Sequence, residues 1–205
     1  MDYLVFIIVG YVLGAIPFGL IATKLITKVD VRDSGSGKTG MTNVIRVSGK
    51  KVGLAVLILD MSKAMIAIAL AKIFTDTPGA ESAAGLAAII GHMFPVFAGF
   101  RGGRAISTGW AGLIILNPWA GLIGTVLGLS MVYASRYMSI GSMIGASIGC
   151  LALIIFAAFK INLPGGAPPP EFIWFGAIGA PIIVLRHFDN IQRLIKGEER
   201  KFREG

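Results

Sequence analysis

The segment that follows the first apolar run of the chain has the composition of a phosphate-binding loop. It reads SGSGKTGMTNVIR, from Ser34 to Arg46. Alternating glycines allow successive backbone N–H groups to converge on an anion, and an arginine adds a planar fork that suits phosphate. The candidate donors and glycines of this loop are Ser36, Gly37, Gly40, Thr42, Asn43 and Arg46. A flexible Gly/Ser linker is the competing interpretation.

Part of this loop, GSGKTG, looks like the loop with which ATPases hold nucleotide phosphates, but one required residue is missing. The nucleotide motif needs a glycine five positions before Gly37, where this chain has Arg32. A strand that ends in an acid should follow, yet the apolar run that leads to Asp60 continues to Phe74 and is too long for a strand. We therefore predict that the loop binds the phosphate of another ligand and that the protein binds no nucleotide.

A second cationic segment reads GHMFPVFAGFRGGRAIST, from Gly91 to Thr108. Two arginines flank two glycines, so that the backbone can approach a ligand closely just before a helix begins. These residues are Arg101, Gly102, Gly103 and Arg104. Membrane anchoring by positive charge would explain the arginines but not the glycines. His92 is a candidate catalyst because histidine titrates near neutral pH, although a packed histidine is the commoner case.

A third segment, RYMSIGSMIGASIG, begins at Arg136 and places Ser139 and Ser142 at the edge of a loop. Its glycines recur every four residues, which is typical of a helix face that packs closely against another helix in a membrane. These are Gly141, Gly145 and Gly149. We predict that the glycines serve packing and that the two serines face the other polar groups at this side of the membrane.

The fourth segment is HFDNIQRLIKGEER, beginning at His187. Asn190 and Arg193 follow at i+3 and i+6 and would lie on one side of a short helix. These three side chains could face a ligand together; a solvated helix beside the membrane is the alternative. Earlier in the chain, Asp60 and Lys63 lie three residues apart within an apolar run. Because charges inside a membrane are costly and normally pair or serve function, we favour an ion pair there over a proton relay.

Composition indicates the kind of protein that must position these residues. Apolar residues make up 55% of the 205-residue chain and charged residues 15%, with a formal net charge of +8. Soluble domains carry about 25% charged residues, and apolar runs near the ~20 residues that cross a bilayer recur along this sequence. The single cysteine, Cys150, excludes a disulfide framework, and the first apolar run is expected to be a retained span rather than a cleaved signal.

These runs predict an all-α, polytopic integral membrane protein with about seven transmembrane helices, the N-terminus outside and the C-terminus cytoplasmic. The expected spans are residues 4–26, 52–74, 83–100, 106–116, 119–134, 140–159 and 172–185. Residues 105–134 could instead form one long span. A break at Asn117-Pro118 places both basic clusters, in residues 28–51 and 186–203, on the cytoplasmic side, where Lys and Arg accumulate. We expect one membrane-embedded domain over residues 1–205, with its polar face toward the cytoplasm.

The chain lacks the motifs of several enzyme classes. It has no G-x-S-x-G elbow, no H-E-x-x-H zinc pair and no cluster of acids for divalent cations. We therefore expect no metal and no cofactor. A cationic, glycine-rich and hydroxyl-rich face that opens onto lipid suits two phosphate-bearing substrates, of which one is apolar.

Together the four segments resemble the bacterial acyl-phosphate:glycerol-3-phosphate acyltransferases, in order and over essentially the whole chain. The shared patterns are SGxxGxTNxxR from Ser36, GHxFPxFxxFxGG from Gly91, RYxSxxS from Arg136 and HxxNIxRLxxGxE from His187, and the D-x-x-K pair at Asp60 also fits. The resemblance implies a seven-span enzyme of the bacterial inner membrane with a cytoplasmic active site. Its partners would be acyl phosphate, glycerol 3-phosphate and the lipid bilayer, with no nucleic acid.

The implied reaction transfers a fatty acyl group from acyl phosphate to the 1-hydroxyl of glycerol 3-phosphate, the first step of phospholipid synthesis, and yields lysophosphatidic acid and phosphate. The residues implied in catalysis are Ser36, Arg46, His92, Arg104, Ser142, His187 and Asn190. Those implied in binding substrate phosphate are Gly37, Gly40, Thr42, Asn43, Arg101, Gly102, Gly103 and Arg193. A transporter of organic phosphates and an inactive family member that binds lipid precursors are the alternatives.

The chain departs from the family pattern at several positions near the two loops. The family usually has asparagine at Lys38, a small residue at Met41, and lysines at the positions of Arg101 and Arg104. Arginine keeps the charge of lysine but changes a point cation into a planar fork. Ala105 replaces a glycine.

Overall fold

The computed structural model describes residues 2–202, and their regular structure is helical apart from one isolated β-bridge between Leu163 and Gly166. This confirms the all-α class. Packing divides the chain into two compact units, one up to Gly112 and one from Leu113 on. The single domain expected over residues 1–205 therefore stays a prediction.

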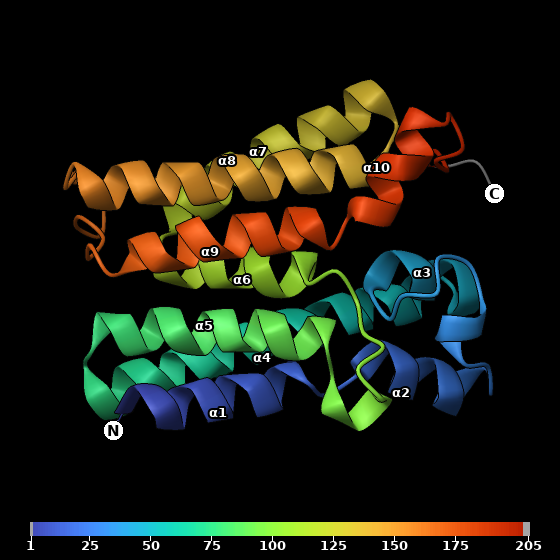
Figure 1. Ribbon diagram of the computed structural model, residues 1–205, viewed down its shortest axis with the longest axis horizontal. Helices are drawn as coiled ribbons and strands as arrows, with labels where there is room; N and C mark the ends of the chain where they lie inside the picture. Colours follow the sequence, from blue (N-terminus) through green and yellow to red (C-terminus); the bar gives the residue numbers. More distant parts are fainter. Residues whose placement is uncertain (1, 203–205) are drawn as a thin grey trace. The chain divides into compact units, whose positions relative to one another are not determined.

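The first unit contains the helices that precede the boundary, which falls inside α6 (Figure 1). They are α1 (Asp2–Gly14), α2 (Phe18–Ile26), η1 (Val31–Asp33), α3 (Met41–Ser48), α4 (Lys50–Thr75), α5 (Pro78–Met93), η2 (Val96–Ala98) and α6 (Ile106–Leu116). The second unit contains α7 (Pro118–Ser135), α8 (Met138–Ala158), α9 (Phe172–Leu185) and α10 (Phe188–Ile195).

Small residues hold the first unit together. α1 lies beside α5, and a Cβ atom on Gly10 or Gly14 would collide with the backbone of Ala84 or Ala88 (Figure 1). Buried alanines from α4 and α5 form the core beneath them: Ala64, Ala67, Ala71, Ala80, Ala84 and Ala88. Small side chains let helix backbones approach closely, which is how helices associate where lipid removes the hydrophobic driving force.

The glycine stripe predicted on residues 141–149 packs as expected in the second unit. A Cβ on Gly145 would lie 2.7 Å from the carbonyl oxygen of Gly124 on α7, and one on Gly128 would lie 2.9 Å from that of Gly141. α7 and α8 therefore touch through their backbones, and the packing prediction is confirmed. This close contact holds the N-terminal end of α8, with its serines, in a defined place.

The predicted break between the fourth and fifth apolar segments is also present. The Asn117 side chain caps α7 by accepting a hydrogen bond from the Ala120 N–H at 2.8 Å, and Pro118 occupies the first turn. Both residue types favour a helix start. The break, chosen over one long span from the distribution of Lys and Arg, therefore falls where it was predicted.

Among residues 2–202, five helical segments are long and apolar enough to span a membrane, and a sixth qualifies if α9 and α10, bent by 51°, form one span. α6 is apolar but has only 11 residues. Each of the seven expected segments contains a helix, but α5 ends at Met93, short of the expected residue 100, and α6 does not meet the length criterion for a span. The protein is a multi-pass membrane protein.

The first expected span, residues 4–26, is broken in the structure. α1 ends at Gly14 and α2 begins at Phe18, because Pro17 between them lacks the N–H that would continue the helix. α2 ends at Ile26, and η1 then precedes the glycine-rich loop.

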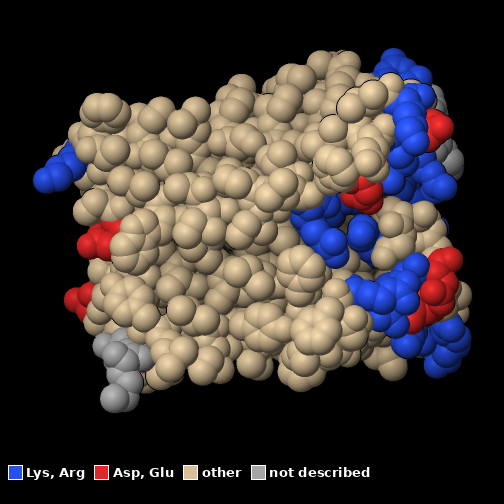
Figure 2. Space-filling model, in the orientation of Figure 1, with Lys and Arg blue, Asp and Glu red and all other residues tan. Residues whose placement is uncertain are grey.

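Charged side chains gather at helix ends within each unit. Figure 2 shows Lys and Arg around α2 and α3 in the first unit and around α10 in the second, while neutral side chains cover the helices between their ends. Such a distribution suits helices surrounded by lipid. On this face the charged side chains thus lie in the loops and at the helix ends, whereas the Asp60–Lys63 pair is buried within α4.

Candidate active site

The glycine-rich loop is organised around the buried amide of Asn43. Its Nδ2 donates hydrogen bonds to the carbonyl oxygens of Val31, Ser34 and Lys38, each at 2.9 Å, and its Oδ1 accepts one from the Ser36 N–H at 3.0 Å. The side chain of Asn43 is only 2% exposed. Asn43 was expected to bind substrate phosphate, but its amide is occupied by the backbone of its own loop. Its geometry is that of a residue that shapes the loop, which excludes a flexible linker.

Some backbone N–H groups of the loop donate hydrogen bonds to other groups of the same segment. The Ser36 N–H donates to Asn43 and the Gly37 N–H to the Ser34 carbonyl at 3.1 Å. The expected anion site therefore does not involve these two amides. The N-terminal end of α3 follows directly, with Gly40 as its cap, and the first N–H groups of a helix lack partners within the helix. An anion can bind there through the Met41 and Thr42 amides.

Two side chains of α3 extend this anion site. Thr42 lies in the first turn and is half-buried, and Arg46 lies one turn further on and is exposed. Residues four apart share a helix face. A hydroxyl and a guanidinium therefore follow the helix N-terminus on one side of α3.

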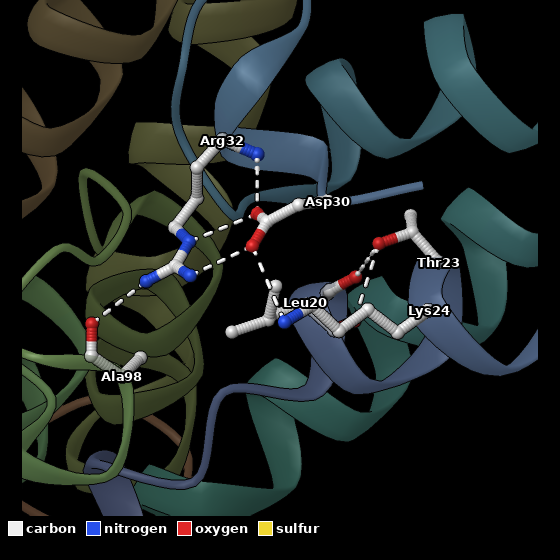
Figure 3. Close-up of polar contacts among 7 residues, drawn as sticks. Leu20, Thr23, Lys24, Asp30, Arg32 and Ala98 are labelled. Carbon is white, nitrogen blue, oxygen red and sulfur yellow. Dashed lines mark hydrogen bonds and ion pairs between the residues drawn. The ribbon is translucent and has the colours of Figure 1, made fainter. Parts of the chain in front are cut away.

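An ion-pair network ties the loop to the chain beyond α5 (Figure 3). The Arg32 guanidinium donates from Nε and Nη2 to the two carboxylate oxygens of Asp30, at 2.9 and 2.7 Å, and from Nη1 to the Ala98 carbonyl at 2.8 Å. Lys24 at the end of α2 lies 3.3 Å from the same carboxylate. The network joins α2, η1 and η2, so the segment before Ser36 and the segment before Arg101 are held together.

The hydrogen bonds from Arg32 hold the pKa of Asp30 well below its usual range, and those to Asp30 raise the pKa of Arg32. A carboxyl group whose pKa is lower in the folded state contributes stability above its unfolded pKa of about 4, and this contribution is lost as the pH falls toward the folded pKa. Asp30→Asn should therefore lower the unfolding temperature at pH 7, and the difference from wild type should shrink between about pH 4 and pH 3.

Unfolding in detergent at pH 7, 5, 4 and 3 measures this effect. The matched control is Asp33→Asn, because Asp33 is an exposed neighbour that acts on Arg32 through its charge but forms no salt bridge with it. A difference between Asp30→Asn and wild type that is as large at pH 3 as at pH 7 would refute the electrostatic interpretation.

The Arg101–Arg104 segment folds back onto the end of α5. The Gly103 N–H donates to the His92 carbonyl at 3.1 Å, and a Cβ on Gly102 would lie 2.7 Å from the Met93 carbonyl oxygen. Both glycines are buried. They were expected to let a phosphate approach the backbone; in the structure they let this segment pass the end of the helix. Arg101 is exposed at its start.

Ala105, where the resembled family has glycine, adopts a left-handed conformation with φ 57°. This conformation costs an alanine about 1–2 kcal/mol that a glycine does not lose. The residue before it is Arg104, which is half-buried. The substitution therefore strains the backbone beside a predicted catalytic residue.

A buried charge cluster lies beneath this segment. Lys63 Nζ is 2.6 Å from Asp60 Oδ1, and both side chains are at most 2% exposed. The ion pair predicted from their spacing is confirmed. The Nδ1 atom of His92 lies 3.3 Å from Lys63 Nζ and 3.6 Å from Asp60 Oδ1, and Thr108 donates to the Asp60 carbonyl at 3.1 Å.

This cluster fixes the His92 ring. Nδ1 faces the ion pair, and the Nε2 edge faces Gly103, where a Cβ atom would collide with the ring. The His92 side chain is 4% exposed. His92 therefore connects the charge pair of α4 to the glycine segment, a position that favours holding this segment over direct proton transfer.

In the second unit, Ser139 and Ser142 lie in the first turns of α8, one turn apart. The Ser139 hydroxyl donates to Glu199 Oε1 at 2.9 Å, and Ser142 is half-buried. His187 precedes α10 and is 2% exposed, with Nδ1 2.8 Å from the Ile183 carbonyl oxygen. A carbonyl oxygen only accepts, so Nδ1 carries a proton, and the neutral ring presents Nε2 as an acceptor.

Asn190 and Arg193 share one side of α10, as predicted, and both contact Glu199. Asn190 Nδ2 lies 2.6 Å from Glu199 Oε1, and Arg193 Nε lies 2.7 Å from Oε2. Asp189 adds a second carboxylate 3.6 Å from Arg193 Nη1. Arg193, expected to bind substrate phosphate, therefore already faces two acids.

Burial alone would raise the pKa of Glu199, but the hydrogen bonds from Asn190, Arg193 and Ser139 outweigh it and hold the pKa below its usual value. Glu199 is ionised at neutral pH. It was not among the residues predicted for the site, although the final glutamate of the HxxNIxRLxxGxE pattern falls on it. Asp30 was missed as well, and nothing in the motifs marks it.

The structure thus gathers the predicted residues into two groups. The first unit holds Ser36, Gly37, Gly40, Thr42, Asn43, Arg46, His92, Arg101, Gly102, Gly103 and Arg104 around the start of α3 and the end of α5. The second holds Ser142, His187, Asn190 and Arg193 at the ends of α8 and α10. Among residues 2–202, no three His, Cys, Asp or Glu side chains are placed to hold a metal ion.

A family model and related proteins match this chain over nearly its whole length. Residues 4–197 match the model of a family described as glycerol-3-phosphate acyltransferase. A protein of that name from Anaeromyxobacter sp. (strain Fw109-5) is 41% identical over 204 residues, which cover 98% of this chain and 96% of the relative. Glycerol-3-phosphate acyltransferase 3 of Dehalococcoides mccartyi is 38% identical over 213 residues, with 98% and 96% coverage.

Two solved structures are also similar to this chain over nearly its whole length. The crystal structure of PlsY (YgiH), an integral membrane glycerol 3-phosphate acyltransferase, in its glycerol 3-phosphate form is similar with a TM-score of 0.87 and 33% identity. The similarity covers 98% of this chain and 96% of that chain. The lysophosphatidic acid form gives a TM-score of 0.85 at the same identity, with 98% and 95% coverage.

Proposed function

The chain belongs to the glycerol-3-phosphate acyltransferase family, and from this premise we propose that its acyl donor is acyl phosphate and its acceptor group the 1-hydroxyl of glycerol 3-phosphate. The protein is a membrane acyltransferase that acylates glycerol 3-phosphate. In this proposal the products are lysophosphatidic acid and inorganic phosphate.

The state of the serines supports direct transfer, and the cationic side chains of the loops favour a donor that carries phosphate. Within residues 2–202, neither the Ser36 nor the Ser142 hydroxyl is hydrogen-bonded to a histidine or a carboxylate. A serine nucleophile needs such a base, so a covalent acyl-enzyme has no support here. Direct transfer requires a donor that is already activated, and an acyl phosphate meets this requirement. The enzyme then supplies position and charge stabilisation.

In the proposed step, the oxygen of the 1-hydroxyl bonds to the acyl carbonyl carbon and the bond from that carbon to the phosphate oxygen breaks. The hydroxyl proton passes to a phosphate oxygen of a substrate. The N-terminal end of α3, Thr42 and Arg46 would bind one phosphate, and Arg101 and Arg104 would stabilise negative charge at a phosphate or at the carbonyl oxygen. Ser142 and His187 complete the proposed set.

The remaining predicted residues receive supporting roles in this proposal. Gly37 and Asn43 shape the loop, Gly40 leaves the start of α3 open, and Gly102 and Gly103 let the Arg101–Arg104 segment pass α5. His92 holds that segment. We further propose that the protein resides in the bacterial inner membrane, with seven spans, the N-terminus outside and these loops on the cytoplasmic side, as the basic clusters favour.

An assay with purified protein tests the donor. Glycerol 3-phosphate is offered with palmitoyl phosphate or with palmitoyl-CoA, and lysophosphatidic acid is measured together with phosphate or free CoA. We expect one phosphate per lysophosphatidic acid from the acyl phosphate, at least 10²-fold faster than from the thioester. We also expect EDTA to leave the rate unchanged, because the site contains no acid cluster for a metal.

Faster transfer from the thioester would overturn the proposed donor. Loss of activity in EDTA that Mg²⁺ restores would overturn the metal-independent mechanism. ATP hydrolysis, measured on the same samples, should remain at the level of a protein-free control.

A further inference from the structure

The segment between α5 and Arg101 carries apolar side chains that the proposed function does not use. Residues 93–100 read MFPVFAGF, without a charged, hydroxyl or amide side chain. In the structure they form the end of α5, η2 and the turn that follows (Figure 1). The side chains of Phe97 and Phe100 are 61% and 58% exposed, and those of Phe94 and Val96 are exposed as well. The three phenylalanines of the GHxFPxFxxFxGG pattern therefore face outward.

α5 by itself is too short to cross the bilayer. It has 16 residues and rises about 24 Å, whereas the hydrocarbon core is about 30 Å thick. The apolar surface of α5 continues into the segment, because Ile90 and Phe94 lie four residues apart on one face and are both exposed. The residues after Phe94 therefore supply the rest of the apolar surface at this end of the span.

The backbone of the segment is largely satisfied from within the protein. The Phe94 carbonyl oxygen accepts a hydrogen bond from the Tyr11 hydroxyl at 3.0 Å, and the Ala98 carbonyl oxygen accepts one from Arg32 at 2.8 Å. The N–H groups that donate to carbonyl oxygens of the segment itself are those of Ala98, Gly99, Phe100 and Arg101. Backbone groups with partners inside the protein can lie beside hydrocarbon without losing hydrogen bonds to water.

Lipid is the surrounding that fits these features. In water, the segment would expose neighbouring apolar side chains at a cost that grows with their area. Arg101 follows it directly and is exposed. Aromatic side chains next to a cation are typical of segments at a membrane surface, where the rings lie among lipid chains and the cation lies near lipid phosphates.

We propose that residues 94–100 dip into the acyl layer of the bilayer, with lipid chains around Phe97 and Phe100, and that this contact holds Arg101 at the level of the lipid phosphates. The lipid contact is independent of the proposed reaction. The consequence for Arg101 rests on the proposed function, because an apolar substrate with a phosphate head lies at the same depth as the lipids.

Fluorescence quenching in vesicles of phosphatidylcholine and phosphatidylglycerol measures the depth of the segment. Phe97→Cys is labelled with a fluorophore, and the native Cys150 is buried and should not react. We expect a lipid with a nitroxide on its acyl chain to quench this label. Iodide in the water should quench it at least about fivefold less than it quenches a label at Lys51.

Three further cysteine positions complete the comparison. Lys51→Cys is the control for water, because Lys51 is exposed at the start of α4, at the same end of the α4–α5 pair. Ile58→Cys is the control for lipid, because Ile58 is exposed two turns further along this spanning helix. Val96→Cys repeats the measurement if Phe97→Cys does not fold. Iodide quenching in the segment as strong as at Lys51 would overturn the inference.

Acyl transfer tests the consequence for Arg101. Phe97→Asp should lower kcat/KM for palmitoyl phosphate about tenfold or more, because a carboxylate is unfavourable in the acyl layer, whereas Phe97→Leu should stay near wild type. Equal values for the two variants would overturn the link to Arg101. If wild type transfers nothing from palmitoyl phosphate, the proposed function fails and the role of Arg101 fails with it, while the quenching, which needs no substrate, still decides the lipid contact.

Discussion

Replacing Gly35 with alanine is expected to reduce acyl transfer by on the order of 10²-fold or more while the protein remains folded. Gly35 has φ 62°, and an added Cβ atom would collide with Oδ1 of Asn43. The collision displaces the amide that holds the loop backbone at four points. The start of α3, where we place a substrate phosphate, would lose its fixed approach. The measurements are kcat/KM for glycerol 3-phosphate and the unfolding temperature in detergent.

Gly165→Ala is the matched control for backbone strain. Gly165 has φ 104° and open space around its Cβ position, and it lies in the connection before α9, at the opposite end of α9 from α10 (Figure 1). It should lose a comparable amount of stability from backbone strain, about 1–2 kcal/mol, and keep its activity. Turnover of Gly35→Ala within about threefold of wild type would show that the loop geometry is not needed.

Three other substitutions in this loop separate its backbone geometry from its contacts with a ligand. Gly37 has φ 68°, so Gly37→Val strains the backbone, whereas Gly40 has φ −79° and nothing within 4 Å of an added Cβ. A loss of activity in a stable Gly40→Val would therefore come from a blocked ligand. Lys38→Asn should keep most of its activity, since the family usually has asparagine there, whereas a nucleotide P-loop would need the lysine.

Lys63→Met is expected to cause the largest loss of stability, about 3–5 kcal/mol, because it leaves the Asp60 carboxylate buried without its cation. Both residues are at most 2% exposed. The double variant Asp60→Leu/Lys63→Met should recover much of this stability, since an apolar pair of similar volume can replace a buried ion pair. We expect it to remain impaired in transfer, because His92 loses both groups that face its Nδ1.

Unfolding midpoints and kcat/KM for the single and double variants form a double-mutant cycle. Lys72→Met is the control, because Lys72 is an exposed lysine on the same helix. If Lys63→Met is as stable as Lys72→Met, the buried pair does not contribute to the fold. If the double variant has wild-type activity, the pair does not position His92.

Local patterns in the sequence were sufficient for features that depend on neighbours along the chain. Composition and apolar runs predicted a helical membrane protein, and the spacing of Asp60 and Lys63 predicted an ion pair on one face of a helix. Both depend on residues within a few positions of one another. The helix break at Asn117-Pro118 was predicted from the distribution of Lys and Arg along the chain, which is also a property of the sequence.

Other features required the tertiary structure, because they depend on which distant group a polar side chain meets. The sequence marks Asn43 as a possible donor to phosphate, but only the folded loop shows that its amide is used by Val31, Ser34 and Lys38. The bridge from Arg32 to Ala98 spans 66 positions, and the one from Ser139 to Glu199 spans 60. A long polar side chain can reach many partners, and packing alone selects one of them. The sequence thus determined which residue types are available for phosphate chemistry, and the tertiary structure decided which of them remain open to a ligand.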